Sequence, residues 1–403
     1  MRQSYTPPSP EERLIVALTA GRSAEAQQVI DSAQFDLDGL LRLAERHMVS
    51  ALVLQRLVGL RLQPDLRARV APVAEQAILR VMAANALVRQ ELRRLSKLFG
   101  RAGVSFVHIK GLAIDRSPVR ITNDLDVLIR REDLERARAA LERDGYRYVG
   151  SEVISEKEKQ RWEKQLTWNN QFQFRSPHGG LTVEVHINLF ERDRIRLENL
   201  GRLLDSVDEF RQESSFDDEL GCLIPSLEAS LALLCVHSAT KRSPAHNTYI
   251  LRHGYEIVHA LQKGIGEARF VELCRSWAIG YYAYVSLRIA AESLGSTEAA
   301  ATARRLEPLL TRRQQRLAEI HCRCYRGLGR ASLVHRARYT LYMPFAIGGG
   351  LAKSLLWYWR ALFPPLWYQE ELFGISRSSP AIYLTYLAGP FVRLYSILTA
   401  RRS

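Results

Sequence analysis

Residues 106–129 read FVHIKGLAIDRSPVRITNDLDVLI and form the most informative stretch of the chain. Residues 104–109 are short and rich in β-forming side chains, and Lys110-Gly111 follows them as a turn. Residues 125–129, Leu-Asp-Val-Leu-Ile, are apolar enough to predict a second strand. The stretch therefore predicts two neighbouring strands joined by a segment that begins at a glycine.

The residues that follow extend this pattern into a small sheet. Residues 131–143 have helical periodicity and end at Asp144-Gly145, where a further strand begins at Tyr146. Residues 171–174 and 181–187 alternate with the two-residue period of half-buried strands, and residues 177–180 between them, Pro-His-Gly-Gly, predict a hairpin turn. We therefore expect a small α/β core over residues 100–222.

Helical patterns dominate both sides of this core. Apolar residues spaced three and four apart recur through residues 1–99, and again through residues 223–340 after Pro225. Residues 341–403 are aromatic and are interrupted by prolines. The sequence thus predicts an α+β fold: a small mixed-sheet core, an N-terminal helical region, a C-terminal helical domain and an aromatic helical tail.

Acidic residues on two of the predicted strands suggest a metal site. Asp124 and Asp126 lie two positions apart, so they project to the same face of their strand. Glu184 on the strand over residues 181–187 is the natural third carboxylate, and His186 shares its face, either bracing Glu184 or contacting a ligand. Such carboxylates repel one another unless a cation lies between them, and oxygen ligands favour Mg²⁺ or Mn²⁺.

The composition is that of a globular protein with an excess of positive charge. Of 403 residues, 47% are hydrophobic and 25% are charged, which argues against a largely disordered chain. The formal net charge is +14, and residues 301–340 alone hold ten Arg and two Glu. Anionic partners such as RNA, phosphorylated ligands or a membrane surface would suit this charge, although a solvated helix face explains it equally well.

The five cysteines are scattered, so we expect neither a disulfide framework nor a disulfide-linked partner. The N-terminus has no apolar secretory segment, and we expect a cytoplasmic protein. Residues 382–400 are apolar but contain Gly389, Pro390 and Arg393, which favours a buried or interfacial helix over a membrane span. The C-terminal tail is therefore where peripheral contact with a membrane would occur.

The motif around Gly111 resembles that of a known superfamily. Gly111, a twelve-residue spacer and Asp124-Leu-Asp126-Val127 resemble the signature of polymerase-β-type nucleotidyltransferases. Residues 109–112 (Ile-Lys-Gly-Leu), Arg120, residues 123–128 (Asn-Asp-Leu-Asp-Val-Leu) and the strand with Glu184 and His186 are more closely similar to a bacterial family of uncharacterised nucleotidyltransferases. The similarity is good over about 80 residues and loose over most of the chain.

The resemblance implies transfer of a nucleoside monophosphate from an NTP, ATP above all, to an unidentified small-molecule, sugar, peptide or protein acceptor. It implies that Asp124, Asp126 and Glu184 are the catalytic residues and hold Mg²⁺ or Mn²⁺, that Lys110 and Gly111 bind the triphosphate, and that Arg120 neutralises developing charge. Lys241, near the end of a predicted helix, is a further candidate nucleotide-binding residue.

The chain departs from the pattern at three positions. Leu112 stands where many superfamily members have Ser after the glycine, Glu184 where Asp is more usual, and Glu256 where we expected Asp, so no role is assigned to Glu256. Two alternatives to this function remain open: an RNA nucleotidyltransferase, and a catalytically inactive nucleotide-binding or scaffold protein. A purely structural alternative makes Asp124 a turn residue, Asp126 an exposed strand residue and Glu184 the cross-strand partner of a lysine or arginine.

Overall fold

The fold is known from a computed structural model. It describes residues 8–32, 35–114, 116–117, 119–120, 122, 124–149, 171–189, 207–241, 250–323, 342, 355, 374–376, 378–386 and 389. The chain forms two compact units: Met1–Lys241 with Thr248–Leu309, and Arg242–Asn247 with Leu310–Ser403. The sheet, and every residue of the site described below, belong to the first unit.

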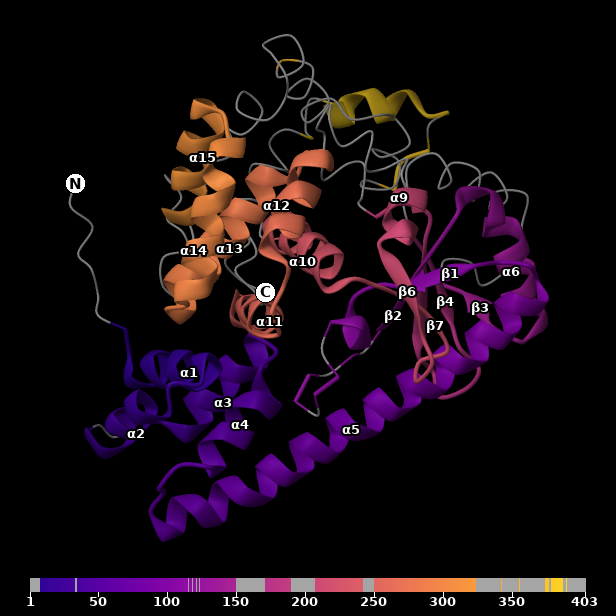
Figure 1. The fold of residues 1–403 in the computed structure, drawn as a ribbon. Helices are drawn as coiled ribbons and strands as arrows, with labels where there is room; N and C mark the ends of the chain where they lie inside the picture. Colours follow the sequence, from indigo (N-terminus) through magenta and orange to yellow (C-terminus); the bar gives the residue numbers. More distant parts are fainter. Residues whose placement is uncertain are drawn as a thin grey trace. The chain divides into compact units, whose positions relative to one another are not determined.

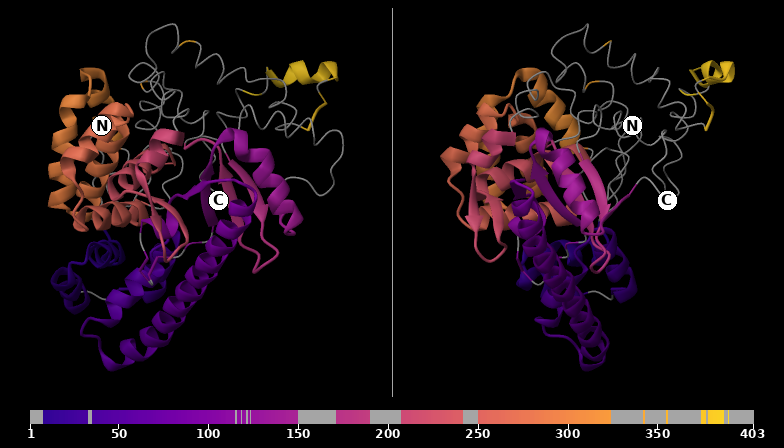
Figure 2. Two further views of the ribbon diagram at one scale, coloured as in Figure 1. Left: turned by 45° about the vertical axis from the view of Figure 1, so that its right-hand side comes forward. Right: turned by 90° about the vertical axis from the view of Figure 1, so that its right-hand side faces the viewer.

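The first unit begins with five helices. The capping box of Ser9 and Glu12 begins the first of them, and Gly21 ends it in the left-handed conformation. The fifth, α5, is 38 residues long and contains Pro72. Figures 1 and 2 show α5 running from these N-terminal helices to the sheet. The helices are α1 (Pro10–Ala20), α2 (Ser23–Ser32), α3 (Leu37–Arg46), α4 (Ser50–Val58) and α5 (Pro64–Arg101).

A mixed sheet of seven strands follows α5, in the order β3-β4-β5-β2-β1-β7-β6. The central strand β2 pairs antiparallel with β1 and parallel with β5. In the parallel register Asp126 lies opposite Glu184, and Leu128 lies opposite His186. The strands are β1 (Phe106–His108), β2 (Asp124–Ile129), β3 (Arg147–Tyr148), β4 (Gln171–Arg175), β5 (Thr182–His186), β6 (Ser214–Asp217) and β7 (Cys222–Pro225).

The two faces of the central strands differ in chemistry. Leu125 and Val127 of β2 and Val183 of β5 are fully buried in one apolar cluster with residues of α5 and α6 (Leu134–Arg143). Because side chains alternate along a strand, Asp126 and Glu184 point to the opposite face. Burial of the apolar set therefore fixes the register, since a slip of one residue would bury the acidic side chains in the hydrophobic cluster.

Helices again follow the sheet. In the first unit α10 and α11 pack against α13, and α13 packs against α14 (Figure 1). Four short 3₁₀ segments complete the described structure: η1 (Gly111–Ala113), η2 (Arg131–Asp133), η3 (Glu307–Leu309) and η4 (Pro380–Leu384). The helices are α9 (Val207–Gln212), α10 (Leu227–Lys241), α11 (Ile250–Gln262), α12 (Glu267–Ser276), α13 (Gly280–Leu294) and α14 (Thr297–Leu306), with α15 (Arg312–Arg323) in the second unit.

The α+β fold class is confirmed, with a mixed sheet between helical N- and C-terminal regions. The boundaries expected at residues 99, 222 and 340 stay predictions. Most of the tail over residues 341–403 lies outside the described residues, and so does Asn123 of the strand motif. Within the part of the chain that the structure describes, no helix combines the length and the apolar character needed to cross a bilayer.

Candidate active site

The turn after β1 has an unusual backbone. Lys110 adopts φ 66° and ψ −162°, a region that residues with a side chain rarely enter and that costs about 1–3 kcal/mol. Gly111 has φ 49°, and a Cβ at this position would lie 3.0 Å from Cγ2 of Thr122 and 3.6 Å from Cε1 of His108. Both the positive φ and the close approach of Thr122 therefore favour glycine at position 111.

The strained conformation of Lys110 accompanies a contact with the neighbouring strand. The Nζ ammonium of Lys110 donates a hydrogen bond to Oδ1 of Asp126. Nε2 of His186 lies 2.8 Å from the same oxygen. Burial alone would raise the pKa of Asp126, but the charge of Lys110 and the hydrogen bond from His186 outweigh it and hold the pKa well below 3.8. Because an ionised carboxylate only accepts hydrogen bonds, Nε2 of His186 carries the proton here.

Glu184 completes this group from the adjacent strand. Its Oε1 accepts a hydrogen bond of 2.7 Å from Nε2 of Gln173 on β4, and its Oε2 lies 3.6 Å from Nε2 of His186. Burial would raise the pKa of Glu184, but the adjacent imidazole of His186 leads the effects that lower it below 4.5. Glu184 is thus a carboxylate at neutral pH, and its side chain remains 14% exposed.

These three side chains form a set of donors that suits a divalent cation. Among the described residues, Asp126, Glu184 and His186 are the one such cluster, and they place one ligand atom each within 4.8 Å of one another. Two carboxylates and an imidazole are compatible with Mn²⁺, and the carboxylates with Mg²⁺. The sequence predicted Asp124, Asp126 and Glu184 as the metal ligands. The structure places the imidazole of His186 in this cluster instead of Asp124.

Asp124 occupies the exposed start of β2, opposite Thr182. Desolvation of its carboxylate, followed by the negative charges of Asp126 and Glu184, raises its pKa above 3.8. A cation placed among these groups would reverse that effect. The charges of Asp126 and Glu184 therefore act on Asp124, but its carboxylate is not among the clustered ligand atoms of Asp126, Glu184 and His186.

His108 supports the site from β1. The residue is fully buried, and its Nδ1 lies 3.0 Å from the backbone carbonyl oxygen of Asp126. Burial lowers the pKa of His108 to about 4, so the ring is neutral and Nδ1–H donates to this carbonyl. His108 thereby fixes the backbone of Asp126 relative to β1.

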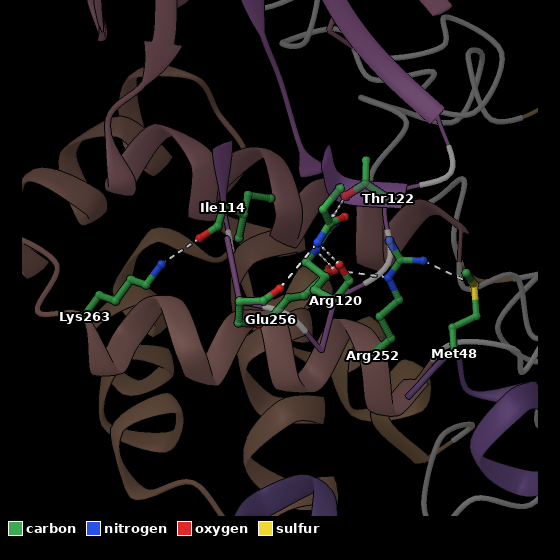
Figure 3. A network of polar contacts seen from close by, with 9 residues as sticks. Met48, Ile114, Arg120, Thr122, Arg252, Glu256 and Lys263 are labelled. Atoms are coloured by element: carbon green, nitrogen blue, oxygen red, sulfur yellow. Dashed lines mark hydrogen bonds and ion pairs between the residues drawn. The ribbon is translucent and has the colours of Figure 1, made fainter. Parts of the chain in front are cut away.

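A second polar network adjoins the site (Figure 3). Arg120 is buried, and its Nε donates to Oε1 of Glu256 on α11 at 2.7 Å, while Nη1 donates to Thr122 Oγ1 at 3.0 Å. Arg252, one turn before Glu256, donates to the same Oε1 at 3.1 Å and from Nη1 to Sδ of Met48 at 3.2 Å. Burial would raise the pKa of Glu256, but the two guanidinium groups lower it to about 2.

Besides Gly111 and Lys241, the predicted site residues fall into three groups. The first group is in mutual contact and consists of Lys110, Asp126, Glu184 and His186. Asp124 lies near enough for their charges to change its pKa. Arg120 forms an ion pair with Glu256. Lys241 is the last residue of α10, and its side chain lies outside the described part.

Sequence reasoning missed Arg252 and assigned no role to Glu256. Their spacing of four residues on a predicted helix is the signal that could have paired these two side chains.

Comparison with protein families agrees with this geometry. A family model described as "Uncharacterised nucleotidyltransferase" matches residues 33–295, which include the whole sheet and helices α3 to α13. The chain belongs to this family of nucleotidyltransferases. Comparison with curated proteins and with solved structures gives no match.

Proposed function

From this family membership and the geometry of the site, we propose that the chain is a metal-dependent nucleotidyltransferase of the polymerase-β type. It moves a nucleoside monophosphate from an NTP, with ATP as the expected donor, to a small-molecule, sugar, peptide or protein acceptor, and pyrophosphate leaves. The observation that carries the proposal is the convergence of Asp126, Glu184 and His186 beside the Lys110-Gly111 turn.

The donor set fits the metal that this reaction uses. Asp126 and Glu184 would hold Mg²⁺ or Mn²⁺, with His186 and Asp124 as the adjoining ligand candidates. When bound, divalent ions neutralise phosphate oxygens and stabilise the charge on the attacking and leaving oxygens. Lys110 Nζ and His186 Nε2 both donate hydrogen bonds to Oδ1 of Asp126. A cation that binds to this oxygen must therefore replace part of these two contacts.

The chain's own residues supply the remaining requirements. A bond forms between the acceptor oxygen and the α-phosphorus, and the bond from that phosphorus to the oxygen bridging to the β-phosphorus breaks. The acceptor's proton passes to Glu184, which is ionised at neutral pH and partly exposed. Lys110 is cationic because Asp126 raises its pKa against the effect of burial, and it balances the negative charge of the leaving pyrophosphate.

The reaction class is tested by label transfer. The full chain is incubated with each NTP labelled at the α-phosphate, with Mg²⁺ or Mn²⁺ and a cell extract. We expect label to move to an acceptor, and Asp126→Asn to reduce the transfer by at least about a hundredfold because a ligand is lost. Asp208→Asn is the matched control, since Asp208 is an exposed acid paired with Arg130 at 2.7 Å.

Two results would contradict the proposal. Asp126→Asn could transfer label as well as the unaltered protein, in which case the acidic pair is not the catalytic centre. Alternatively, no NTP could transfer label to an acceptor in any extract, and Asp126→Asn could leave Mn²⁺ binding unchanged when it is measured by electron paramagnetic resonance. That outcome would favour the inactive scaffold.

RNA is a second candidate acceptor, favoured by the net charge of +14. Electrostatic contact with phosphates predicts RNA binding that weakens steeply as salt is raised. Label recovered in RNA and abolished by ribonuclease would identify this acceptor. Peripheral membrane contact through residues 341–403 and a cytoplasmic location stay expectations from the sequence.

A further inference from the structure

Two guanidinium groups share one carboxylate oxygen on α11. Arg120 and Arg252 both donate through Nε to Oε1 of Glu256, which is only 2% exposed. Within this trio two positive charges face one negative charge, and both guanidinium groups share a single carboxylate oxygen. The partly exposed guanidinium of Arg252 therefore keeps N–H donors for an anion that approaches from outside.

Arg252 is the member of the network that such an anion can reach. The side chain of Arg252 is 20% exposed, whereas that of Arg120 is 7% exposed. Nε of Arg252 donates to Glu256, and Nη1 of Arg252 donates to Sδ of Met48. Within the described residues no hydrogen bond engages Nη2 of Arg252. Figure 3 shows the guanidinium held between these two partners on the side of α11 that faces Arg120 and Thr122.

The position of Arg252 connects this charge to the candidate active site. Arg120, which shares Oε1 of Glu256 with Arg252, donates from Nη1 to Oγ1 of Thr122 at 3.0 Å. A Cβ at Gly111 would lie 3.0 Å from Cγ2 of Thr122, so the network borders the Lys110-Gly111 turn. Arg252 therefore adds positive charge from α11 to that of Lys110 in the turn after β1. A ligand that binds a metal at the carboxylates would thus meet positive charge from two separate elements.

We propose that Arg252 binds the polyphosphate of the nucleotide and that Glu256 and Met48 hold its guanidinium for this contact. The inference rests on the proposed function, because it takes an NTP with its metal as the ligand of the carboxylates. An arginine fork matches a phosphate group with two parallel N–H donors, and a fork already held by Glu256 loses little freedom on binding. A helix outside the sheet thereby becomes part of the nucleotide site.

Binding of inorganic tripolyphosphate with Mg²⁺ tests this assignment, because the probe has no base and cannot be confused with base recognition. Isothermal titration of the full chain should show that Arg252→Gln weakens binding by about 10- to 100-fold, the range for loss of a charge-assisted contact. Arg252→Lys keeps the charge without the fork and should weaken binding less. Arg138→Gln is the matched control: Arg138 pairs with Glu142 four residues on at 2.8 Å, with 23% exposure.

The outcomes separate this inference from the proposed function. If Arg252→Gln and Arg252→Lys both bind tripolyphosphate like the unaltered protein, Arg252 does not hold phosphate, although label transfer can still stand. If the unaltered protein transfers label without binding tripolyphosphate, the inference is also wrong. If it neither binds the probe nor transfers label, the proposed function itself fails. Thermal unfolding checks each variant, and Arg252→Lys supplies the answer if Arg252→Gln does not fold.

Discussion

Replacing Glu256 by Gln should destabilise the protein strongly, because it leaves two guanidinium groups without their shared carboxylate. The pKa of Glu256 falls from 4.5 to about 2 on folding. At about 1.4 kcal/mol for each pH unit, this fall corresponds to roughly 3 kcal/mol of stability at pH 7. Removal of one partner from a buried ion pair typically costs about 3–5 kcal/mol, so the two routes agree. We expect Glu256→Gln to lower the free energy of unfolding by about 3 kcal/mol.

The pH dependence identifies the cause of this loss. A carboxylate whose pKa is lowered by folding stabilises the native state above its unfolded pKa of 4.5, and that stabilisation disappears as pH falls toward about 2. Between pH 6 and pH 3.5 the difference between the unaltered protein and Glu256→Gln should therefore shrink by roughly 1 kcal/mol. Below pH 2 the carboxyl group is neutral in both states and the contribution is absent.

Urea unfolding followed by circular dichroism at several pH values measures both effects. Glu142→Gln is the matched control, since Glu142 is 38% exposed and pairs with Arg138 in the same four-residue spacing. Exposed helix pairs of this kind contribute about 0.3–0.5 kcal/mol. A loss below about 1 kcal/mol for Glu256→Gln, or a loss that stays constant from pH 6 to pH 3.5, would refute the electrostatic account of this network.

Three further perturbations test the turn, the acidic pair and the core. Gly111→Ala should destabilise by about 1–3 kcal/mol in urea unfolding, because of its φ of 49° and the close approach to Thr122, while Gly100→Ala, with open space around it, should not destabilise. Lys110→Met should bind Mn²⁺ about tenfold more tightly at pH 7 by electron paramagnetic resonance, because one cation beside Asp126 is gone; unchanged or weaker binding contradicts this. Iodoacetamide at pH 8 should leave four buried cysteines unmodified in the folded chain and label them in urea: Cys222, Cys235, Cys274 and Cys322. Burial raises the pKa of the Cys222 thiol to about 12, so little reactive thiolate forms there. Labelling of these four cysteines before unfolding would contradict this.

Local patterns predicted most of the sheet and many of the helices. Strand alternation located β4, β5 and the hairpin between them, and apolar spacing predicted helices in the region that holds α10, α11 and α13. Strands β6 and β7 were missed because each has four residues, and β7 ends at Pro225, which breaks the usual strand pattern. Helix α2 lies within the region predicted as helical, although it buries only two residues, Ala26 and Val29.

The candidate site was predictable only as far as strand periodicity reaches. Alternation places Asp124 and Asp126 on one face, but the parallel register with β5 determines which of them meets Glu184 and His186. That register depends on burial of apolar residues from several segments. The pairing of Arg120 with Glu256 joins residues 136 positions apart, and no local pattern specifies such a contact.

The helical regions are part of the site because they hold the segment between β1 and β2. This segment begins at the strained Lys110, and η1 is the regular structure among those of its residues that the structure describes. Asn85 of α5 donates to the carbonyl oxygen of Arg120 at 3.0 Å, and Lys263, just after α11, donates to that of Ile114 at 2.9 Å (Figure 3). A strained residue persists only where surrounding contacts determine its conformation. Since Asn85, Glu256 and Lys263 all lie outside residues 100–222, contacts from the helical regions help to hold the segment that joins the Lys110-Gly111 turn to the carboxylates.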